Sequence, residues 1–309
     1  MPHQSPVTGH QSLRALLGAA IAHLELSHVP SAPLAAELLL MHVLDRDRAW
    51  IYANPEQEFD PETCERYFSL IGRRANGMPA QYLTGHQEFW GLDFEVTPGV
   101  LIPRPETEHV IEVALERLGI AADTDIAGRQ AQIRVADVGT GSGCIAIALA
   151  HELPRSRVTA TDISAAALEV ARRNAERHGV AERIEFIECD LLDVIPHQSP
   201  ATSHQSRCFD LIVSNPPYIG RREAATLPPE VREHEPESAL FGGELGTEMY
   251  GPLIAQAATL LKPGGILVLE LGYNLAEHVS YLLDAPEWTA VAITNDLAGI
   301  QRVASARRK

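Results

Sequence analysis

The chain has 309 residues, of which 45% are hydrophobic and 21% are charged. That length suffices for about two domains of ~150 residues each, and the composition is typical of a soluble protein with a large hydrophobic core. The formal net charge is -16, from 25 basic and 41 acidic side chains. Proteins that bind duplex nucleic acid mainly through its phosphates are usually basic, so this charge argues against such a role, and we expect no direct nucleic-acid partner.

The four cysteines, Cys64, Cys144, Cys189 and Cys208, are scattered and form no Cys-x-x-Cys pair. No histidine lies beside them at metal-ligand spacing, so we interpret them as reduced thiols and expect no metal site. The N-terminus lacks a basic stretch followed by an apolar core, and no apolar run approaches the ~18 residues that span a bilayer. These features predict a cytoplasmic protein without a membrane partner.

One internal repeat is visible, because residues 3–12 recur nearly unchanged at 197–206. Both copies are polar and lack hydrophobic periodicity, so neither buries enough apolar surface to offset the entropy cost of ordering. Their histidines could bind a metal, but an inserted linker explains this composition better. We therefore predict a disordered tail at 1–11 and a disordered insertion at 197–206.

Residues 12–76 have the pattern of a small helical domain. A first helix places leucines from Leu13 to Leu24 on one face, a second opens at Ser31, and a third begins at Asp60-Pro61 with an N-cap and a first-turn proline. Nothing in this segment resembles a catalytic motif. We interpret it as a module that docks a substrate.

Residues 77–103 change character, since β-forming residues alternate between glycine turns at Gly85 and Gly91. We predict a β-hairpin that links two domains, with strands on both sides of Gly85. Immediately after it, Pro105 is expected in the first turn of a helix that extends to about Leu118.

Strand and helix patterns alternate from about residue 132 to the end, within a predicted domain at 104–309. This alternation is typical of a mostly parallel sheet with helices on both faces, which binds ligands at the carboxyl ends of its strands. The predicted strands are 133–138, 157–161, 183–188, 209–214, 265–271, 288–294 and 301–306. The predicted helices are 143–152, 164–178, 248–261 and 274–284.

A glycine-rich turn follows the first of these strands. In the segment from Asp137 to Cys144, glycines stand at alternate positions after an acidic residue, which differs from the Gly-x-Gly-x-x-Gly pattern. Gly139 and Gly141 permit a tight turn and a close approach to a ligand, and Gly143 lets the next helix pack on the sheet. The amides that open that helix suit an anionic group. We expect this segment to bind a cofactor through Asp137, Gly139, Thr140, Gly141, Ser142 and Gly143.

The next two strands also end in residues suited to a nucleoside. Asp162 can accept both hydroxyls of a ribose, although it could instead cap the following helix near Ser164. Asp190 can accept from an adenine amine, and Leu191 can cover the face of the ring. Three strand ends along one edge predict a nucleoside-binding site more strongly than any one of them.

The fourth strand ends in Asn215-Pro216-Pro217-Tyr218. The two prolines stop the strand and stiffen the backbone, so the carbonyls of Asn215 and Pro216 point in fixed directions. The Asn215 side chain and the Pro216 carbonyl can accept the N–H bonds of a planar amide or amine, while the Tyr218 ring stacks on its plane. The tetrad could also be a plain strand-ending turn, since a short motif alone is weak evidence.

Taken in order, the Asp137 glycine turn, Asp162, Asp190 and the Asn-Pro-Pro-Tyr tetrad resemble a class I S-adenosylmethionine-dependent methyltransferase of the amino-group type. Further segments narrow the resemblance to the HemK family, called PrmC in bacteria. They are Tyr82–Gly85, Phe89–Gly91, Leu101–Glu108, Glu235-Pro236, Ala239-Leu240, Gly242-Gly243 and Asp296–Gly299 with Arg302. The chain departs from the family pattern in its two repeat segments and at Leu191, where an aromatic is common.

The resemblance implies a Rossmann-like, mostly parallel seven-stranded sheet, S-adenosylmethionine as cofactor, and methylation of the side-chain amide nitrogen (N5) of the glutamine in the Gly-Gly-Gln motif of peptide chain release factors. It implies catalysis by Asn215, Pro216 and Tyr218, with Asn215 also near the cofactor. Substrate contacts would come from the tetrad, including Pro217, and from Phe89, Arg104 and Glu106. The family also implies a monomer. A ribosomal-protein glutamine or the N6 amine of adenine in DNA remain alternative acceptors, because the same tetrad serves all three.

Overall fold

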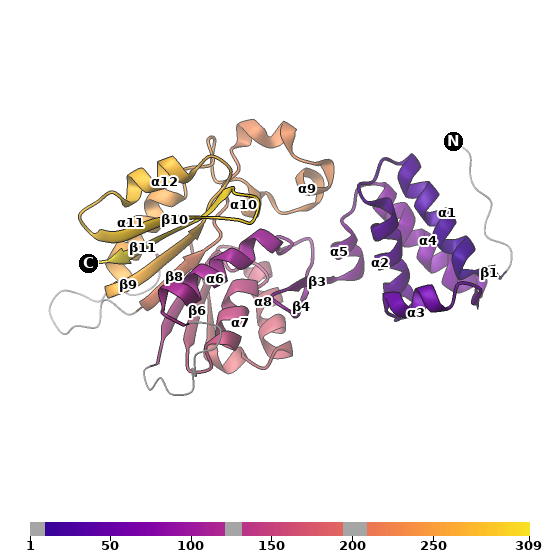
Figure 1. Cartoon of the computed structure of the whole chain (residues 1–309), viewed down its shortest axis with the longest axis horizontal. Coiled ribbons are helices and arrows are strands. Elements are labelled where there is room, and N and C mark those ends of the chain that lie inside the picture. Colours follow the sequence, from indigo (N-terminus) through magenta and orange to yellow (C-terminus); the bar gives the residue numbers. More distant parts are fainter. Residues whose placement is uncertain (1–9, 121–131, 194–208) are drawn as a thin grey trace. The chain divides into compact units, whose positions relative to one another are not determined.

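The structure is a computed structural model that describes residues 10–120, 132–193 and 209–309. The chain divides into two compact units. One comprises the residues up to His86 together with Pro228–His234, and the other comprises Gln87–Leu227 and Glu235–Lys309. We call them the helical unit and the sheet unit and describe each by itself (Figure 1).

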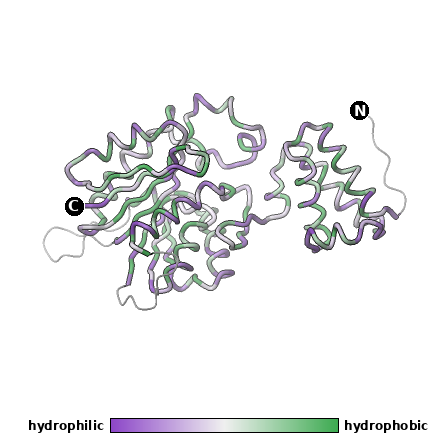
Figure 2. Tube along the Cα trace, in the orientation of Figure 1, coloured by the Kyte–Doolittle hydropathy of each residue, from purple (hydrophilic) through white to green (hydrophobic). Residues whose placement is uncertain are grey.

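The helical unit packs its helices around a core of leucine, isoleucine and alanine side chains, with Tyr67 fully buried among them. Figure 2 shows hydrophobic and hydrophilic residues alternating along these helices, as expected for helices that bury one face. The elements are β1 (Gln11–Ser12), α1 (Leu13–Leu26), α2 (Ala32–Leu44), α3 (Arg48–Ala53), β2 (Glu58–Phe59), α4 (Pro61–Ala75), α5 (Ala80–Thr84) and α9 (Pro229–His234).

The residues at the N-termini of α4 and α2 show how far local capping explains where these helices begin. The Asp60 carboxylate accepts from the Thr63 amide at 2.8 Å and Pro61 occupies the first turn of α4, which confirms the predicted cap. The second helix does begin after Ser31, but Ser31 has a left-handed backbone with φ of 51° and its side chain makes no capping bond. Gln11, predicted to lie in the disordered tail, instead pairs with Phe59.

The sheet unit contains a seven-stranded sheet in the order β10-β11-β9-β8-β5-β6-β7, which confirms the predicted fold class. Strands β9, β8, β5, β6 and β7 run parallel to one another, while β11 is antiparallel to both β9 and β10. The strands are β5 (Arg134–Val138), β6 (Arg157–Asp162), β7 (Ile184–Glu188), β8 (Phe209–Ser214), β9 (Leu261–Glu270), β10 (Trp288–Asn295) and β11 (Gln301–Arg308).

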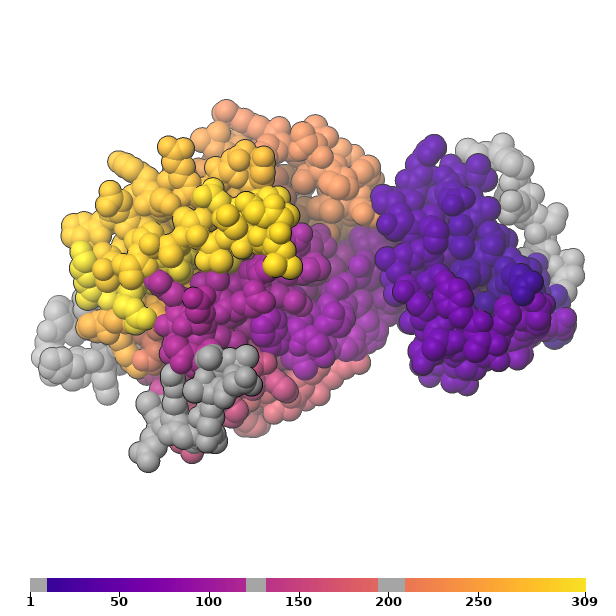
Figure 3. Space-filling model, viewed as in Figure 1, coloured from indigo at the N-terminus to yellow at the C-terminus, as the bar shows by residue number. Residues whose placement is uncertain are grey.

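Helices cover both faces of this sheet. They are η1 (Pro105–Thr107), α6 (Glu108–Arg117), α7 (Cys144–Glu152), α8 (Ala165–Arg177), η3 (Ala181–Arg183), η4 (Arg221–Thr226), α10 (Glu237–Leu240), α11 (Tyr250–Leu260) and α12 (Ala276–Leu283). Alternate strand residues explain the two faces: Val135 and Val213 pack with α6 and α7, whereas Ala136 and Ile212 pack with α11 and α12. In Figure 3, atoms of the C-terminal strands (yellow) lie beside those near residue 117 (magenta), where the Arg307 guanidinium donates to the Arg117 carbonyl.

A short hairpin of β3 (His86–Phe89) and β4 (Leu92–Glu95) precedes the sheet. The predicted hairpin therefore exists, but its first expected strand is wrong, because residues 80–84 form helix α5 and Gly85 ends that helix with a left-handed φ of 79°. The insertion predicted at 197–206 and the tail at 1–9 lie outside the described residues. None of the helices in the described ranges is long and apolar enough to cross a membrane.

Candidate active site

A pocket opens in the sheet unit where the parallel strands end. It collects side chains and backbone from the segment after the hairpin, from the ends of β5, β6, β7 and β8, and from the start of α10. Among the predicted cofactor residues it is lined by Gly139, Gly141, Asp162, Asp190, Leu191 and Asn215. The sequence therefore located the edge of the sheet at which the pocket lies.

The other predicted residues of the glycine turn are not part of the pocket lining. Asp137 is fully buried, and its carboxylate accepts from the Thr140 hydroxyl at 2.7 Å and from the Ala146 amide at 3.1 Å. Burial raises the pKa of Asp137 to about 7. Thr140 and Ser142 are also buried. The bonds of Asp137 to Thr140 and Ala146 hold the shape of the turn, whereas the Ser142 hydroxyl has no hydrogen-bond partner among the described residues. A direct contact from Asp137, Thr140 or Ser142 to a cofactor remains a prediction.

Gly143 permits close packing between the turn and the next helices. A Cβ at this position would lie 3.0 Å from the Ile147 side chain and 3.1 Å from that of Ala171 on α8. The backbone also has a φ of 85°, which favours glycine. Gly143 therefore permits close packing of α7 against α8, whereas the sequence predicted packing of a helix on the sheet, and a cofactor contact by Gly143 remains a prediction.

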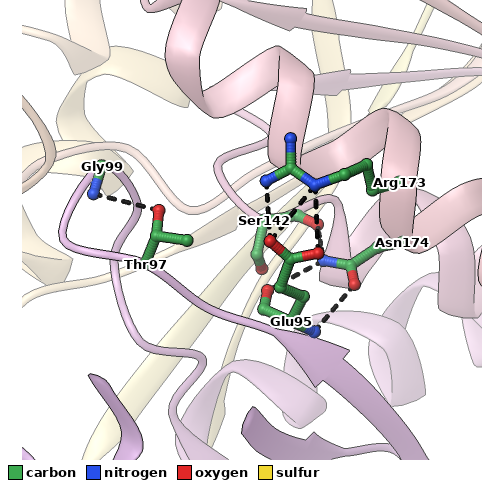
Figure 4. Close-up of polar contacts among 6 residues, drawn as sticks. All are labelled: Glu95, Thr97, Gly99, Ser142, Arg173 and Asn174. Atoms are coloured by element: carbon green, nitrogen blue, oxygen red, sulfur yellow. Dashed lines mark hydrogen bonds and ion pairs between the residues drawn. The ribbon is translucent and has the colours of Figure 1, made fainter. Parts of the chain in front are cut away.

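The hairpin is tied to the glycine turn through α8 (Figure 4). The buried Asn174 side chain accepts from the Glu95 amide at 2.8 Å and donates to the carbonyls of Glu95 and Ser142 at 3.0 and 2.9 Å. Arg173 forms an ion pair with the Glu95 carboxylate. This arrangement fixes the start of the segment that brings Gly99 to the pocket wall.

Asp162, at the end of β6, lines the pocket. Its carboxylate accepts from the Gly141 amide and from the Ser164 amide, both at 2.9 Å. Burial raises the pKa of Asp162. Asp162 thus contacts the start of α8, whose N-cap is Ser164, and also lines the pocket, while its role toward a ribose remains a prediction.

Apolar and acidic groups alternate along the rest of the pocket edge. Ile163 is 63% exposed and lines the pocket, and so does Leu191, whose backbone has a left-handed φ of 49°. Asp190 is exposed beside it. Ile163 was not predicted, although its position directly after Asp162 on the same rim was a usable signal.

These residues suit S-adenosylmethionine. The carboxylates of Asp162 and Asp190 offer acceptors for hydroxyl and amine groups and favour a cationic ligand, and Ile163 and Leu191 offer apolar surface for a planar ring. Gly141, with no side chain and a φ of 57°, permits a close backbone approach.

The tetrad lies at the end of β8. Asn215, Pro216 and Pro217 line the pocket, and the Asn215 amide donates from Nδ2 to the Thr107 hydroxyl at 3.0 Å. This bond orients Nδ2 toward η1, which leaves the Oδ1 oxygen as the acceptor of the side chain. The Tyr218 hydroxyl donates to Glu270 at 3.2 Å, and burial raises the pKa of Tyr218 above its ordinary value.

A second segment, from Leu240 to Gly246, packs against the backbone of the tetrad and of Ile219. The Ile219 amide donates to the Leu240 carbonyl at 3.0 Å, and the Gly242 amide donates to the Ile219 carbonyl at 3.1 Å. Side chains at Gly242 and Gly246 would overlap the carbonyls of Pro217 and Tyr218. The glycines after α10 therefore let this segment press directly on the tetrad backbone.

The other three residues predicted to contact the substrate each lie in a different environment. Phe89 is a correction: it is 1% exposed in the hydrophobic core and packs edge-on against Phe94, so its ring has no surface to offer a substrate. Arg104 is half-buried and forms an ion pair with the buried Glu235. Glu106 is exposed. Substrate contacts by Arg104 and Glu106 remain predictions.

Two protein families match the chain. The PrmC N-terminal domain family matches residues 15–85, and the Methyltransferase domain family matches residues 129–298. Together these matches cover the helices of the helical unit and most of the sheet.

Curated relatives match along almost the whole chain. A release factor glutamine methyltransferase from Koribacter versatilis is 46% identical over 297 residues, which cover 96% of this chain and 99% of the relative. One of the same name from Nitratidesulfovibrio vulgaris is 40% identical over 97% of each chain. Among solved structures, the hMettl16 catalytic domain in complex with a MAT2A 3'UTR hairpin superposes with a TM-score of 0.53 over 77% of this chain and 81% of that one. At 17% identity, that likeness shows the fold alone.

Proposed function

Because the chain belongs to the release factor glutamine methyltransferase family, we propose that it methylates the side-chain amide nitrogen, N5, of the glutamine in the Gly-Gly-Gln motif of a peptide chain release factor. The methyl donor is S-adenosylmethionine. The observation that carries the proposal is the Asn215 amide, which lines the pocket with its Nδ2 committed to Thr107 and its Oδ1 available to accept from a substrate amide.

The chemistry of the substrate amide explains why a hydrogen-bond acceptor such as Asn215 Oδ1 is needed. An amide nitrogen is a poor nucleophile because its lone pair is delocalised into the carbonyl. Acceptor bonds from the Asn215 oxygen and the Pro216 carbonyl to the two N–H groups raise the electron density on nitrogen and favour its pyramidal form. In this mechanism the Tyr218 ring stacks on the amide plane.

S-adenosylmethionine supplies an electrophilic methyl group on a sulfonium, whose sulfur leaves as a neutral thioether. The chain itself has little charge to create or neutralise, so its residues contribute mainly by holding and aligning the acceptor. Asp162, Asp190 and Leu191 would hold the nucleoside, and Gly139 and Gly141 would admit the rest of the cofactor. The amide proton leaves to solvent after transfer, when the methylated nitrogen is strongly acidic.

The proposed function also includes a docking partner, an oligomeric state and a cellular location. The helical unit, which contains the PrmC N-terminal domain match, would dock a part of the release factor away from the glutamine. The enzyme would act as a monomer in the cytoplasm, where release factors act, and the net charge of -16 disfavours direct binding to nucleic acid.

The test is a parallel methyl-transfer assay with tritiated S-adenosylmethionine and three acceptors: release factor, ribosomes and DNA. We expect label only in release factor, and mass spectrometry should place one added CH₂ on the Gly-Gly-Gln peptide. A release factor with glutamate in place of that glutamine is the matched control and should take no label. Label in ribosomes or DNA instead would overturn the choice of acceptor.

Asn215→Ala tests the role of the tetrad. Removing the amide deletes the acceptor for the substrate N–H but leaves the nucleoside side of the pocket intact, so methylation should fall by more than about 100-fold while S-adenosylmethionine affinity changes little. Asn295→Ala, an exposed asparagine at the end of β10, is the control. An equal loss of cofactor affinity, measured by calorimetry, would count against this assignment.

A further inference from the structure

We propose that Glu235 is a positioning residue for S-adenosylmethionine, because its buried carboxylate fastens the segment 99–107 along the edge of the cofactor pocket. We call residues 99–107 the strap. This role rests on the proposed function, since it requires that S-adenosylmethionine occupies this pocket. Glu235 and the strap both belong to the sheet unit.

The strap runs along the edge of the sheet at which the parallel strands end. At its start, the Gly99 amide donates to the Thr97 hydroxyl at 3.3 Å (Figure 4), and a Cβ on Gly99 would lie 3.8 Å from the Ala166 side chain on α8, which follows β6. At its end, the Thr107 hydroxyl accepts from Asn215 Nδ2 at 3.0 Å, just after β8. Because β5 lies between β6 and β8 in the sheet, the strap passes the ends of all three strands.

The first part of the strap forms one wall of the pocket. Gly99, Val100 and Leu101 line it. Residues 99–104 belong to neither a helix nor a strand of the described chain, so no sheet or helix bonds hold them. Such a segment opens locally at a lower free energy than the strands beneath it. Its position therefore depends on side-chain bonds.

Glu235 supplies these bonds. Its side chain is 1% exposed, and a buried carboxylate needs donors to offset the loss of hydration. The Oε1 oxygen accepts from the Arg104 guanidinium in an ion pair, and the Oε2 oxygen accepts from the Ile102 amide at 3.4 Å. The bond to Ile102 is long, so the charge-assisted bond to Arg104 contributes most of the attachment. Both oxygens of this buried carboxylate are thus bonded to the strap.

The chain directly after Glu235 forms another wall of the pocket. Pro236, Ser238 and Ala239 line it, and the next carbonyl, that of Leu240, accepts from the Ile219 amide beside the tetrad at 3.0 Å. Glu235 itself lies outside the pocket lining that the described residues form. It therefore acts through its neighbours, by joining the strap to the segment that begins α10.

This attachment predicts an effect on cofactor affinity and not on chemistry. If the strap opens more often, S-adenosylmethionine binds only the closed fraction, and its apparent affinity falls by that fraction. Saturating cofactor closes the strap again, so the KM for S-adenosylmethionine rises while kcat stays near its normal value. A direct part in methyl transfer would instead lower kcat.

The first experiment compares Glu235→Gln with Glu237→Gln. Glutamine keeps the size of the Glu235 side chain, but it loses the charge and one of the two acceptor oxygens. We expect the Kd for S-adenosylmethionine, measured by calorimetry, to rise about 10-fold, and kcat for release factor at saturating cofactor to stay within about 2-fold of wild type. Glu237, whose carboxylate pairs with Arg221 at the exposed surface, is the matched control and should bind as wild type. Unchanged affinity in Glu235→Gln, or an equal loss in both variants, would overturn the proposal.

Hydrogen exchange separates a role in the strap from a role in the fold. In Glu235→Gln, peptides that cover residues 99–107 should exchange faster than in wild type, while β5 and β8 stay protected. Saturating S-adenosylmethionine should remove this difference, because it binds the closed strap. Faster exchange throughout the sheet would show that Glu235 merely supports the fold and would sink its positioning role.

Variants of Arg104 test the other end of the ion pair. Arg104→Lys keeps the charge and should weaken S-adenosylmethionine binding by at most about 3-fold, whereas Arg104→Met should weaken it about 10-fold. Adding Arg104→Met to Glu235→Gln leaves no unpaired buried charge and should weaken binding no further, since the bond is already lost. A multiplicative loss would contradict this account. So would an Arg104→Met variant that raises only the KM for release factor, because Arg104 would then bind the substrate and not the strap.

Calorimetry needs no methyl acceptor, so it separates the two levels of inference. Wild-type protein that binds S-adenosylmethionine but leaves release factor unmethylated would refute the proposed function alone, and the strap variants would still be decisive. Wild-type methylation of release factor together with normal cofactor affinity in Glu235→Gln would refute only the role of Glu235.

Discussion

At the scale of single residues, the sheet unit keeps two carboxyl groups, Asp137 and Glu270, in its interior near the pocket. Each is fully or almost fully buried, and burial raises the pKa of each to about 7. Among the described residues, neither has a cationic side chain at salt-bridge distance, and hydroxyl and amide groups donate to them instead. The unit therefore gives up stability at these positions to hold the glycine turn and the tetrad in place.

This cost predicts a pH dependence of stability. Asp137 titrates near 3.8 when exposed and near 7 in the folded protein, so between these values the folded state binds more protons. The free energy of unfolding should therefore fall as the pH rises through this window. Asp137→Asn, which cannot ionise, should remove part of that fall between about pH 4 and about pH 7 in urea titrations. Asp284→Asn, an exposed control at the end of α12, should leave the fall unchanged; equal slopes for all three proteins would refute this account.

The space beside Tyr218 gives a second prediction at this scale. In Gly272→Ala, the new Cβ would lie 2.7 Å from Tyr218 Cδ2, so the ring must move and its bond to Glu270 must break or lengthen. We expect kcat to fall by about 10-fold or more with little change in cofactor affinity. Gly251→Ala in α11 is the matched control, since a Cβ there meets nothing within 4 Å. Similar kinetics for the two variants would contradict the proposed packing.

At the scale of elements, the hairpin and the glycine turn depend on one buried amide. Asn174 satisfies the amide and the carbonyl of Glu95 and the carbonyl of Ser142. In Asn174→Ala these groups lose their partner, and we expect the free energy of unfolding to fall by about 2–4 kcal/mol and cofactor binding to weaken. Arg173→Ala removes only a half-exposed ion pair to Glu95 and should cost within about 1 kcal/mol. Chemical denaturation of the two variants measures both losses of stability. Equal losses would rule out the special role of Asn174.

Periodicity predicted the elements of the sheet unit well, because buried parallel strands and amphipathic helices have strong patterns. The strand predicted at 209–214 has those bounds, and the predicted helix at 143–152 forms as Cys144–Glu152. The short elements were missed: residues 80–84 alternate like a strand but form α5, and residues 229–234 have too few residues for a helical period to be visible.

In the candidate site, too, some residues could be predicted from the sequence and others could not. Residues at strand ends, such as Asp162 and Asn215, were predictable because topology brings the carboxyl ends of parallel strands together. The contacts of Thr107 with Asn215 and of Glu270 with Tyr218 were not predictable, because they depend on which side chains meet in three dimensions. A single acidic residue at the end of the apolar run 266–269 was the only signal of Glu270. Phe89 was misassigned because an aromatic in a characteristic segment can serve the core as well as a substrate.

At the scale of the whole molecule, the helical unit is built from two distant parts of the chain. Residues 228–234, which follow the tetrad in sequence, belong to the helical unit with the residues up to 86. Within that unit, the buried Arg74 guanidinium on α4 donates to the Glu230 carboxylate at 2.5 Å and to the Met78 carbonyl at 3.2 Å. The integrity of the predicted docking module thus depends on a segment encoded between parts of the methyltransferase domain.

Glu230→Gln tests this dependence. It leaves the buried charge of Arg74 without its counter-charge, and breaking a buried ion pair by removing one partner is strongly destabilising. Because the Glu230 side chain is 30% exposed, water will offset part of the loss, and we expect about 1–3 kcal/mol. Hydrogen exchange should quicken in α4 while the strands β5 and β8 stay protected, since the change lies within the helical unit.

Glu233→Gln is the matched control on the same helix, because Glu233 pairs with its neighbour Arg232 at the surface. It should leave exchange in α4 unchanged. In a methylation assay, Glu230→Gln should raise the KM for release factor and leave S-adenosylmethionine affinity as in wild type, because the docking module loosens while the pocket is untouched. Equal exchange in α4 for the two variants would mean that residues 228–234 do not stabilise the helical unit, and an unchanged KM despite faster exchange would mean that this unit does not dock the release factor.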